Sequence, residues 1–366
     1  MRNRGKAKYF HGRKEELDLF RGTLNIAKIE NGGTIFIIQG SPGVGKSALL
    51  EEFKELGVAE EWGVVEISHD GLWDAHELRK YLHKDYTIKL KELKAGASAY
   101  GLGMEGVFSI NEKSVLQILE SSKKPLLLML DEGQHLADVL NADFQIFKDT
   151  KKVLDNIHNN KFRVPLVFVI SGLGMTKKII QNFGVSILDD KSIVNLEKLD
   201  KLSEQEILKD WIYQEGGLNQ TIQSKLWIEK ITEFTHGWPH HINAYGRSAS
   251  EWIKKHPNKL TMEGLNWVLK DGEQKRFDYY DERFDTLTLK ETELITELLI
   301  VHRNVDEFRD ESIIDFFKEK TSLEEAEKLF DRTVEKGVFH RQKNKKYSVA
   351  VPSMRTWLID QFGQDL

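Results

Sequence analysis

TIFIIQ-GSPGVGKS-ALL, residues 34–50, is the stretch of sequence that decides the fold. Its first six residues are a short β-branched and aromatic run, which predicts a buried strand. The next eight match the G-x-x-x-x-G-K-[ST] pattern, and the apolar residues after them begin a predicted helix. A glycine-rich turn that matches by chance is the alternative, but the strand before and the helix after are the context that a phosphate loop requires. The fixed positions of the pattern are Gly40, Gly45, Lys46 and Ser47.

Each part of this loop has a role in holding phosphate. The glycines let the backbone curl so that N–H groups converge on phosphate oxygens, and the dipole of the following helix favours an anion. Lys46 can place a point charge against the β- and γ-phosphates, and the Ser47 hydroxyl can bind Mg²⁺. The residues expected to contact the bound nucleotide here are Gly40, Ser41, Pro42, Gly43, Val44, Gly45, Lys46, Ser47 and Ala48.

The composition is that of a soluble globular chain with more than one domain. A length of 366 residues exceeds one ordinary core. The absence of cysteine excludes disulfides and thiolate metal sites and fits a reducing compartment. Without an apolar signal core or a run long enough to span a membrane, a cytoplasmic protein with no membrane partner is expected. The net charge of −5 argues against a chain that coats nucleic acid, although it leaves a local basic patch open.

A second strong signal is LLLMLDE, residues 126–132. A continuous apolar run is what a central parallel strand needs, and such a strand ends at the sheet edge where ligands bind. Asp131 follows the run, so we expect it to help hold Mg²⁺. A strand that ends in a solvated turn is the alternative. The upstream phosphate loop favours the magnesium assignment.

The segment before the phosphate loop carries a family resemblance. Phe10, Gly12, Arg13 and Leu17 match an F-x-G-R-x-x-E-L entry segment. Together with the two motifs above, this segment resembles the AAA+-like and STAND-like ATPases, including origin-recognition initiators and transposition-regulator ATPases. The resemblance implies ATP and Mg²⁺ as cofactors and places Arg13 beside the adenine. An ordinary helix start with a solvated arginine is the alternative.

The resemblance also assigns roles to four later residues. Glu132 is similar to the residue that polarises the attacking water, which favours hydrolysis over a kinase reaction. Ser171, at the end of the apolar run 166–170, resembles sensor 1, although it is also a common turn residue. THGWPHHI, residues 235–242, resembles the sensor-2 segment, which puts Pro239 near the adenine and His241 toward the phosphates. Catalytic roles are therefore expected for Glu132, Lys46 and Ser171.

One feature departs from the family. The sequence has no arginine between Val164 and Gly246, where many oligomeric members carry an arginine finger. Lysine is a point charge and not a planar fork, so it is a poor substitute. The gap puts ring-type hydrolysis completed by a neighbour in doubt and leaves a homo-oligomer and a low-turnover scaffold open.

The predicted fold is α/β, a P-loop parallel sheet with a helical lid and a C-terminal winged-helix-like domain. The expected boundaries are 1–200, 201–288 and 289–366, with 278–287 as the link to the last domain. Helices are also expected at 73–82 and 114–121, and a hairpin or insertion at 94–110. The third C-terminal helix carries several acidic residues, which phosphates would repel, whereas the tip 341–346 is basic.

The sequence thus predicts an ATP-binding and ATP-hydrolysing switch that acts on a partner through its C-terminal domain. Two alternatives stay open. One is a DNA-binding initiator or transposition-regulator ATPase, with double-stranded DNA as the partner. The other is a nucleotide-binding scaffold with little turnover. Double-stranded DNA or a protein is the expected partner of the C-terminal domain.

Overall fold

The computed structural model describes residues 7–67, 119–120, 122–137, 144–185, 192–257, 259–285, 287–342 and 346–363. The expected helix at 73–82 and hairpin at 94–110 lie outside the described residues, as do most of the expected helix at 114–121 and residues 343–345 of the basic tip 341–346.

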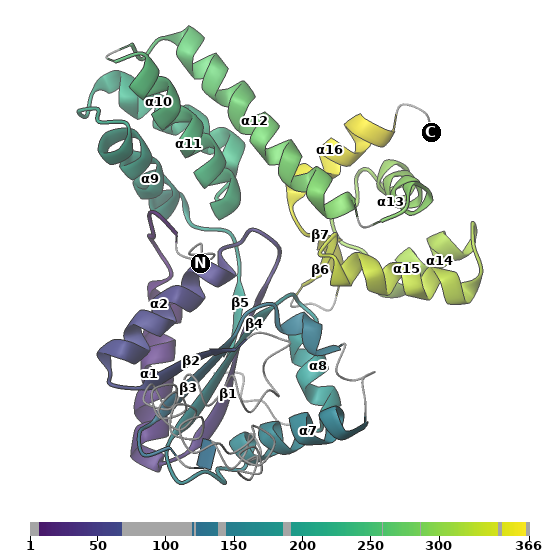
Figure 1. Ribbon diagram of the computed structural model, residues 1–366. Coiled ribbons are helices and arrows are strands. Elements are labelled where there is room, and N and C mark those ends of the chain that lie inside the picture. The colour runs from purple at the N-terminus through teal and green to yellow at the C-terminus, as the bar shows by residue number, and fades with distance from the viewer. Residues whose placement is uncertain are drawn as a thin grey trace, which may run out of the picture. The chain divides into compact units, whose positions relative to one another are not determined.

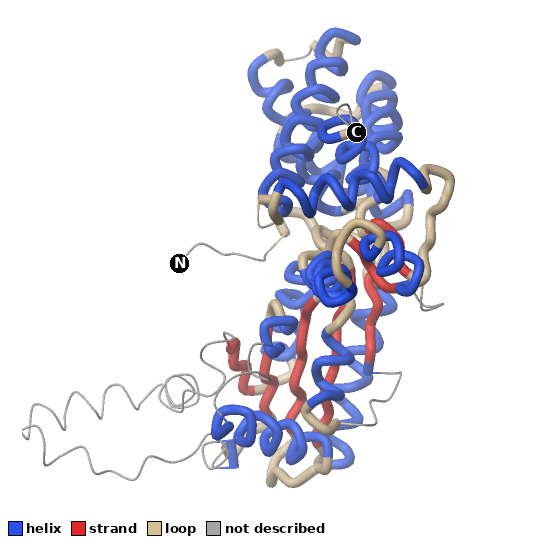
Figure 2. The backbone as a smooth tube through the Cα atoms, turned by 90° about the vertical axis from the view of Figure 1, so that its right-hand side faces the viewer, coloured by secondary structure: helices blue, strands red, loops and turns tan. Residues whose placement is uncertain are grey.

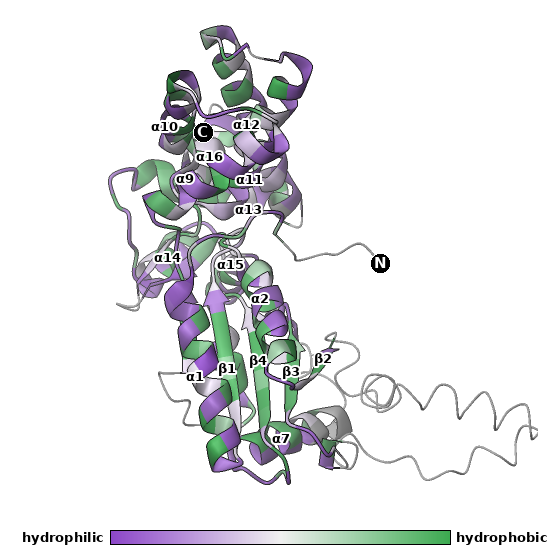
Figure 3. Cartoon of the chain, turned by 90° about the vertical axis from the view of Figure 1, so that its left-hand side faces the viewer, coloured by the Kyte–Doolittle hydropathy of each residue, from purple (hydrophilic) through white to green (hydrophobic). Residues whose placement is uncertain are grey.

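A five-stranded sheet carries the first half of the chain, in the order β2-β3-β4-β1-β5. The pairs β2–β3, β3–β4 and β4–β1 are parallel. All residues of β3 and β4 are buried, and Figure 3 shows the strands as hydrophobic, as a sheet covered on both faces requires. The strands are β1 Gly33–Gly40, β2 Gly63–Ile67, β3 Leu126–Leu130, β4 Leu166–Gly172 and β5 Ile193–Leu196.

Helices cover both faces of this sheet, as Figures 1 and 2 show. On one face Phe20 of α1 stacks on Phe53 of α2 with ring centroids 3.9 Å apart, and both rings meet Phe36 of β1. On the other face α7 and α8 pack on Ile35 and Ile37, the alternate side chains of the same strand. The helices are α1 Lys14–Glu30, α2 Lys46–Ala59, α7 Phe144–His158 and α8 Thr176–Asn182, with a 3₁₀ turn, η2, at Gly133–His135.

The predicted lid is helical, with its own core of tryptophan, tyrosine and isoleucine side chains. A π-helical turn, η4, follows the first helix directly. The last helix continues through Phe284, so most of the segment expected to be a link at 278–287 is helical instead. The elements are α9 Lys201–Lys209, η4 Asp210–Glu215, α10 Ile222–Thr235, α11 Pro239–Lys255 and α12 Met262–Phe284.

The last part of the chain has three helices, an antiparallel hairpin and a terminal helix, in the order that the sequence predicts. Capping boxes at Thr288 and Ser322 begin the first and third of these helices by binding their unpaired N–H groups. The elements are α13 Leu289–Val301, α14 Asp310–Lys318, α15 Leu323–Glu335, β6 Phe339–Arg341, β7 Tyr347–Val349 and α16 Pro352–Phe362.

The chain divides into two compact units that do not follow the order of the sequence. One, which we name the sheet unit, contains residues 14–39 and 49–194. The other, the lid unit, contains residues 1–13, 40–48 and 195–366. The phosphate loop therefore groups with the C-terminal half of the chain, while the expected boundaries at 200 and 288 stay predictions.

Candidate phosphate-loop site

Two successive carbonyls of the phosphate loop are bound by the lid segment GWPHH. The indole Nε1 of Trp238 donates to the Pro42 carbonyl at 3.0 Å, and the backbone N–H of His240 donates to the Gly43 carbonyl at 3.1 Å. Trp238 is 8% exposed, so both partners of its hydrogen bond are shielded from water. A buried carbonyl needs a donor, and the lid supplies one at each of these positions.

The third carbonyl in this run is bound by the entry segment. The Arg13 guanidinium donates to the Val44 carbonyl at 3.0 Å and to the Glu197 carbonyl at 2.6 Å. Gly12 and Arg13 both have left-handed backbones, with φ of 81° and 61°. A side chain at Gly12 would also come within 2.7 Å of the Ser203 hydroxyl. The turn that aims Arg13 at the loop therefore depends on the glycine before it.

The backbone of the loop turns at two left-handed glycines. Gly43 has φ of 72°, and a Cβ added there would lie 2.9 Å from the Cβ of His240 and 3.0 Å from the hydroxyl of Tyr279. Gly45 has φ of 96° and lies 3.6 Å, measured from its added Cβ, from the ring of Pro239. Both positions favour glycine, and the first also has no room for a side chain. Pro239, expected near the adenine, thus lies against the loop itself.

The lysine of the motif folds back over its own loop. The Lys46 ammonium donates to the carbonyls of Gly40 and Ser41, each at 3.1 Å, and the residue is 8% exposed. Ser47 and Ala48 are half-buried in the first turn of α2. N–H groups of a first helical turn lack intrahelical acceptors, so this end of the helix can bind an anion. This end of α2 therefore offers the N–H donors that a phosphate group requires.

His241 is neutral at physiological pH. It is 1% exposed, and burial, followed by the charge of Arg276, lowers its pKa to about 2. Its Nε2 lies 3.0 Å from the hydroxyl of Tyr280, which lies 2.6 Å from the hydroxyl of Ser353 in α16. The expected basic side chain is therefore an uncharged member of a chain of hydrogen bonds from the lid to the last helix.

Two further histidines lie close to the loop. The His240 ring stacks on Tyr279 with centroids 3.9 Å apart. His340 belongs to the hairpin strand β6, and burial, followed by the charge of Lys46, lowers the pKa of His340 to about 4. The charge interaction places the C-terminal hairpin near the lysine of the phosphate loop, which the sequence motifs alone do not indicate.

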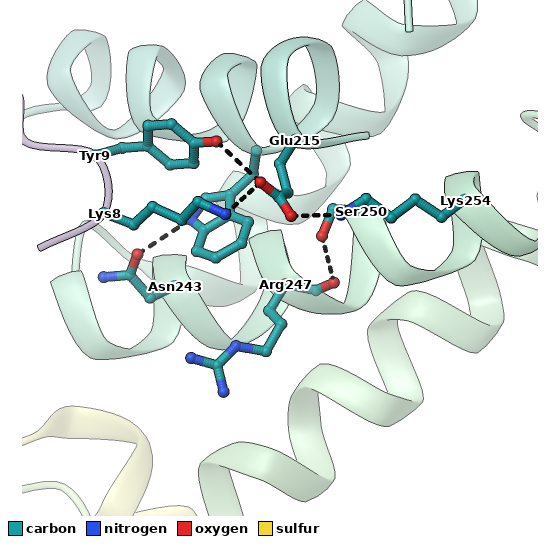
Figure 4. Close-up of polar contacts among 8 residues, drawn as sticks. Lys8, Tyr9, Glu215, Asn243, Arg247, Ser250 and Lys254 are labelled. Atoms are coloured by element: carbon teal, nitrogen blue, oxygen red, sulfur yellow. Dashed lines mark hydrogen bonds and ion pairs between the residues drawn. The ribbon is translucent and has the colours of Figure 1, made fainter. Parts of the chain in front are cut away.

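The N-terminal segment that carries Arg13 is fixed to the π-helical turn η4. Figure 4 shows Lys8, Tyr9 and Lys254 converging on the carboxylate of Glu215. Hydrogen bonds from Lys254 and then Lys8 lower the pKa of this carboxyl to about 2. The Tyr9 ring packs edge-on against Trp211 at 5.2 Å. This cluster holds the entry segment on the lid.

The acidic residues of the second motif lie in the sheet unit. Leu130 pairs with Ile170 in register, so Asp131 and Ser171 follow neighbouring parallel strands at the carboxyl edge. The buried Ser171 hydroxyl has no hydrogen-bond partner among the residues that the structure describes. Glu132 adopts a left-handed backbone with φ of 55°. An unpaired hydroxyl and a strained acidic residue at one strand edge are features of functional sites.

Within the described ranges, no three His, Cys, Asp or Glu side chains are grouped so that they could hold a metal ion. The predicted magnesium ligands, Ser47 and Asp131, are a hydroxyl and one carboxylate, the kind of sparse oxygen set that suits Mg²⁺ when substrate phosphates complete its shell.

Several residues of this arrangement were missed by the motif analysis. Tyr279, His340 and Gln134 lie outside any sequence pattern. Only the structure shows that they lie near motif residues. Trp238 has no assigned role in the motif patterns. Its side chain is buried, and its indole N–H binds the loop.

The strand order, the phosphate loop after β1 and the acidic pair after β3 define a P-loop α/β protein with the AAA+ fold and a helical C-terminal region. Among the described residues, no helix has the length and apolarity to cross a membrane.

Comparison with solved structures confirms this fold. The chain is similar to the ORC2 protein of Aeropyrum pernix in its ADPNP–ADP complexes, with a TM-score of 0.55, 10% identity, and coverage of 99% of this chain and 96% of that one. The ADP form of the same protein gives a TM-score of 0.56 at 12% identity, with the same coverage of both chains. A RuvB variant from Thermotoga maritima gives 0.51 at 11% identity, covering 96% and 97%. No protein-family model matches the sequence, and no curated protein matches it.

Proposed function

We propose that the protein is an ATP-binding and ATP-hydrolysing switch of the initiator type, which couples its nucleotide state to double-stranded DNA through its C-terminal region. The observation that carries the proposal is the run of three P-loop carbonyls held by the lid and the entry segment. These contacts hold the loop in one conformation, and we propose that backbone N–H groups of the loop bind phosphate from it. The initiator assignment is supported by similarity to ORC2 over nearly the whole chain.

Each residue of the proposed site has its own role in the reaction. Lys46 and the loop backbone bind the triphosphate, and Glu132 orients the attacking water. Ser171 supplies a buried hydroxyl for the γ-phosphate or the water. Ser47 and Asp131 hold Mg²⁺, which supplies positive charge against the phosphate oxygens.

The lid is proposed to sense the γ-phosphate. Because His241 is neutral, this response does not come from a charge on its ring. It comes from the loop carbonyls that Trp238 and His240 hold, so that a shift of the loop on binding or hydrolysis moves α11. Tyr280 and Ser353 then link α11 to the terminal helix α16.

The first experiment tests nucleotide binding. We expect Lys46→Ala to weaken ATP affinity about 100-fold or more, since it removes a charge-assisted contact to phosphate. Lys54→Ala on the same helix, whose ammonium pairs with Glu51 and Glu66 instead, serves as the matched control and should bind ATP normally. Equal affinity of the wild type and Lys46→Ala would count against the proposal.

The second experiment tests the DNA partner. ATP turnover is measured with and without duplex DNA and over a range of protein concentrations. We expect DNA to change the turnover, and we expect duplex affinity to fall with salt and on charge reversal in the segment 341–346. A rate per subunit that rises steeply with concentration would indicate an oligomer that completes the site.

One observation favours a protein partner as a second candidate. The third C-terminal helix, α15, exposes acidic residues along its length, and phosphates repel such a face. If duplex DNA neither binds nor changes turnover, the acidic face points to a basic protein surface as the partner. The residues are Glu324, Glu325, Glu327, Asp331 and Glu335.

A further inference from the structure

Gln134 joins the acidic motif to the end of the neighbouring strand. Its Nε2 donates to Oε2 of Glu132, and its Oε1 accepts the backbone N–H of Leu173 at 3.2 Å. The residue is 9% exposed. One buried amide therefore binds the carboxylate of Glu132 with its donor end and the segment after Ser171 with its acceptor end.

The surroundings leave this amide little freedom. A Cβ added at Gly172 would lie 2.9 Å from Oε1 of Gln134 and 2.3 Å from the hydroxyl of Thr176. That hydroxyl donates to the Leu173 carbonyl at 2.7 Å. The turn after β4 is thus packed tightly around the amide, and only glycine fits at its start.

Glu132 itself is held in an unusual conformation. Its φ of 55° is left-handed, which is a strained backbone for a residue other than glycine. Its backbone N–H donates to Oδ1 of Asp131 at 2.9 Å. Such a backbone persists only where neighbouring contacts over-determine it, and the hydrogen bond from Gln134 is one of these contacts.

We propose that Gln134 is a positioning residue, which orients the carboxylate of Glu132 for its work on the attacking water and fixes it relative to Ser171. This inference rests on the proposed hydrolysis of ATP. An amide suits the role because it can donate to a carboxylate while it accepts from a backbone N–H, and it carries no charge that would change with pH.

The test uses Gln134→Glu in the full chain. This change keeps the acceptor for Leu173 but replaces the donor to Glu132 with a second carboxylate, so a purely structural role of the acceptor end is preserved. We expect the turnover number to fall by about 10- to 100-fold, as for a misplaced catalytic group, with ATP affinity unchanged. We also expect the acid limb of the pH–rate profile to move to higher pH, because a like charge disfavours ionisation.

Two controls accompany this variant. Gln214→Glu changes another amide that donates to a carboxylate, that of Asp210 in the lid unit, and should leave turnover and its pH profile as in the wild type. Gln134→Met, similar in length and suited to a buried position, replaces the glutamate variant if that one does not fold. It should show the same loss of turnover with unchanged ATP affinity.

The outcomes separate this inference from the proposed function. If the wild type shows no turnover, or Glu132→Gln is as active as the wild type, the proposed hydrolysis fails. If Glu132→Gln is inactive while the folded Gln134 variant keeps full turnover and its pH profile, the positioning role alone is overturned. A rise in turnover would overturn it too, because it would mean that Gln134 restrains Glu132.

Discussion

Trp238 shows how much one side chain adds to a motif. The glycine–lysine pattern specifies which residues can cradle phosphate, but the loop carbonyls need donors from elsewhere, and this indole supplies one across 196 positions of sequence. No local pattern predicts such a contact, since it depends on which lid helix reaches the loop.

We therefore expect Trp238→Phe to weaken ATP binding about 5- to 10-fold, the equivalent of one hydrogen bond of about 1 kcal/mol. The ring still fills most of the buried volume. Trp252→Phe is the control, because the Trp252 Nε1 donates to the Lys259 carbonyl at 3.2 Å within the lid. It should cost stability without changing affinity. Isothermal titration calorimetry measures the ATP affinity of both variants. Equal losses of affinity in the two would contradict the role of Trp238.

His241 and His340 make stability depend on pH. Their pKa values of about 2 and about 4 lie below the ordinary value of 6.5, so the unfolded chain takes up these protons first as the pH falls. Their contribution to the free energy of unfolding is complete above pH 6.5. It falls as the pH drops below 6.5, and for His340 this fall ends at about pH 4.

The expected loss is about 1.4 kcal/mol of unfolding free energy per histidine for each pH unit below 6.5. Chemical denaturation of the wild type and of His340→Asn between pH 7 and 4.5 measures it. The variant should lose stability less steeply with falling pH, whereas identical slopes would mean that His340 does not titrate in this way.

At the scale of elements, β1 and α7 approach so closely that glycine is required where they meet. A Cβ added at Gly33 would lie 2.4 Å from the Ile157 carbonyl. Gly22 in α1, by contrast, has nothing within 4 Å.

Gly33→Ala should therefore destabilise the protein by about 1–3 kcal/mol through overpacking. Gly22→Ala should stabilise it by about 0.5–1 kcal/mol, because alanine favours a helix interior. Thermal unfolding of the two variants should show shifts of opposite sign, and a shift of the same sign in both would contradict the close approach.

The elements themselves were largely predictable. The apolar runs at β1, β3 and β4 and the capping boxes at Thr288 and Ser322 are local signals, and the structure has a strand or a helix at each of them. The end of α12 was not predictable, because the link expected at 278–287 contains charged and aromatic residues that suit a helix as well as a loop. There Tyr280 and Phe284 pack on Trp357 of the terminal helix, and this tertiary contact prolongs the helix.

At the scale of the whole chain, the hydrogen bonds of His241, Tyr280 and Ser353 join the segment 235–242 to α16. The sensor-2 resemblance of residues 235–242 predicts a basic side chain at His241, but no local pattern shows that the ring is buried and neutral. Burial depends on α12 and on Arg276, which lie far away in sequence.

We expect Tyr280→Phe to uncouple α16 from the nucleotide. Hydrogen exchange of α16 should differ between the ATP-bound and free forms of the wild type and differ less in the variant, because the link between His241 and Ser353 is gone. Tyr213→Phe removes a similar hydroxyl contact, to Ser224 at 3.0 Å within the lid, and should keep the nucleotide response. An unchanged response in Tyr280→Phe would rule out this route.

The anchoring of the phosphate loop by distant residues has a consequence for the newly made protein. Because the partners of the Pro42 and Gly43 carbonyls are about 200 residues downstream, a ribosome must complete α11 before they can engage. Domains generally fold from the N-terminus during synthesis, but this loop reaches its final conformation late. The unfinished chain thus lacks the donors to these two carbonyls until the lid has left the ribosome.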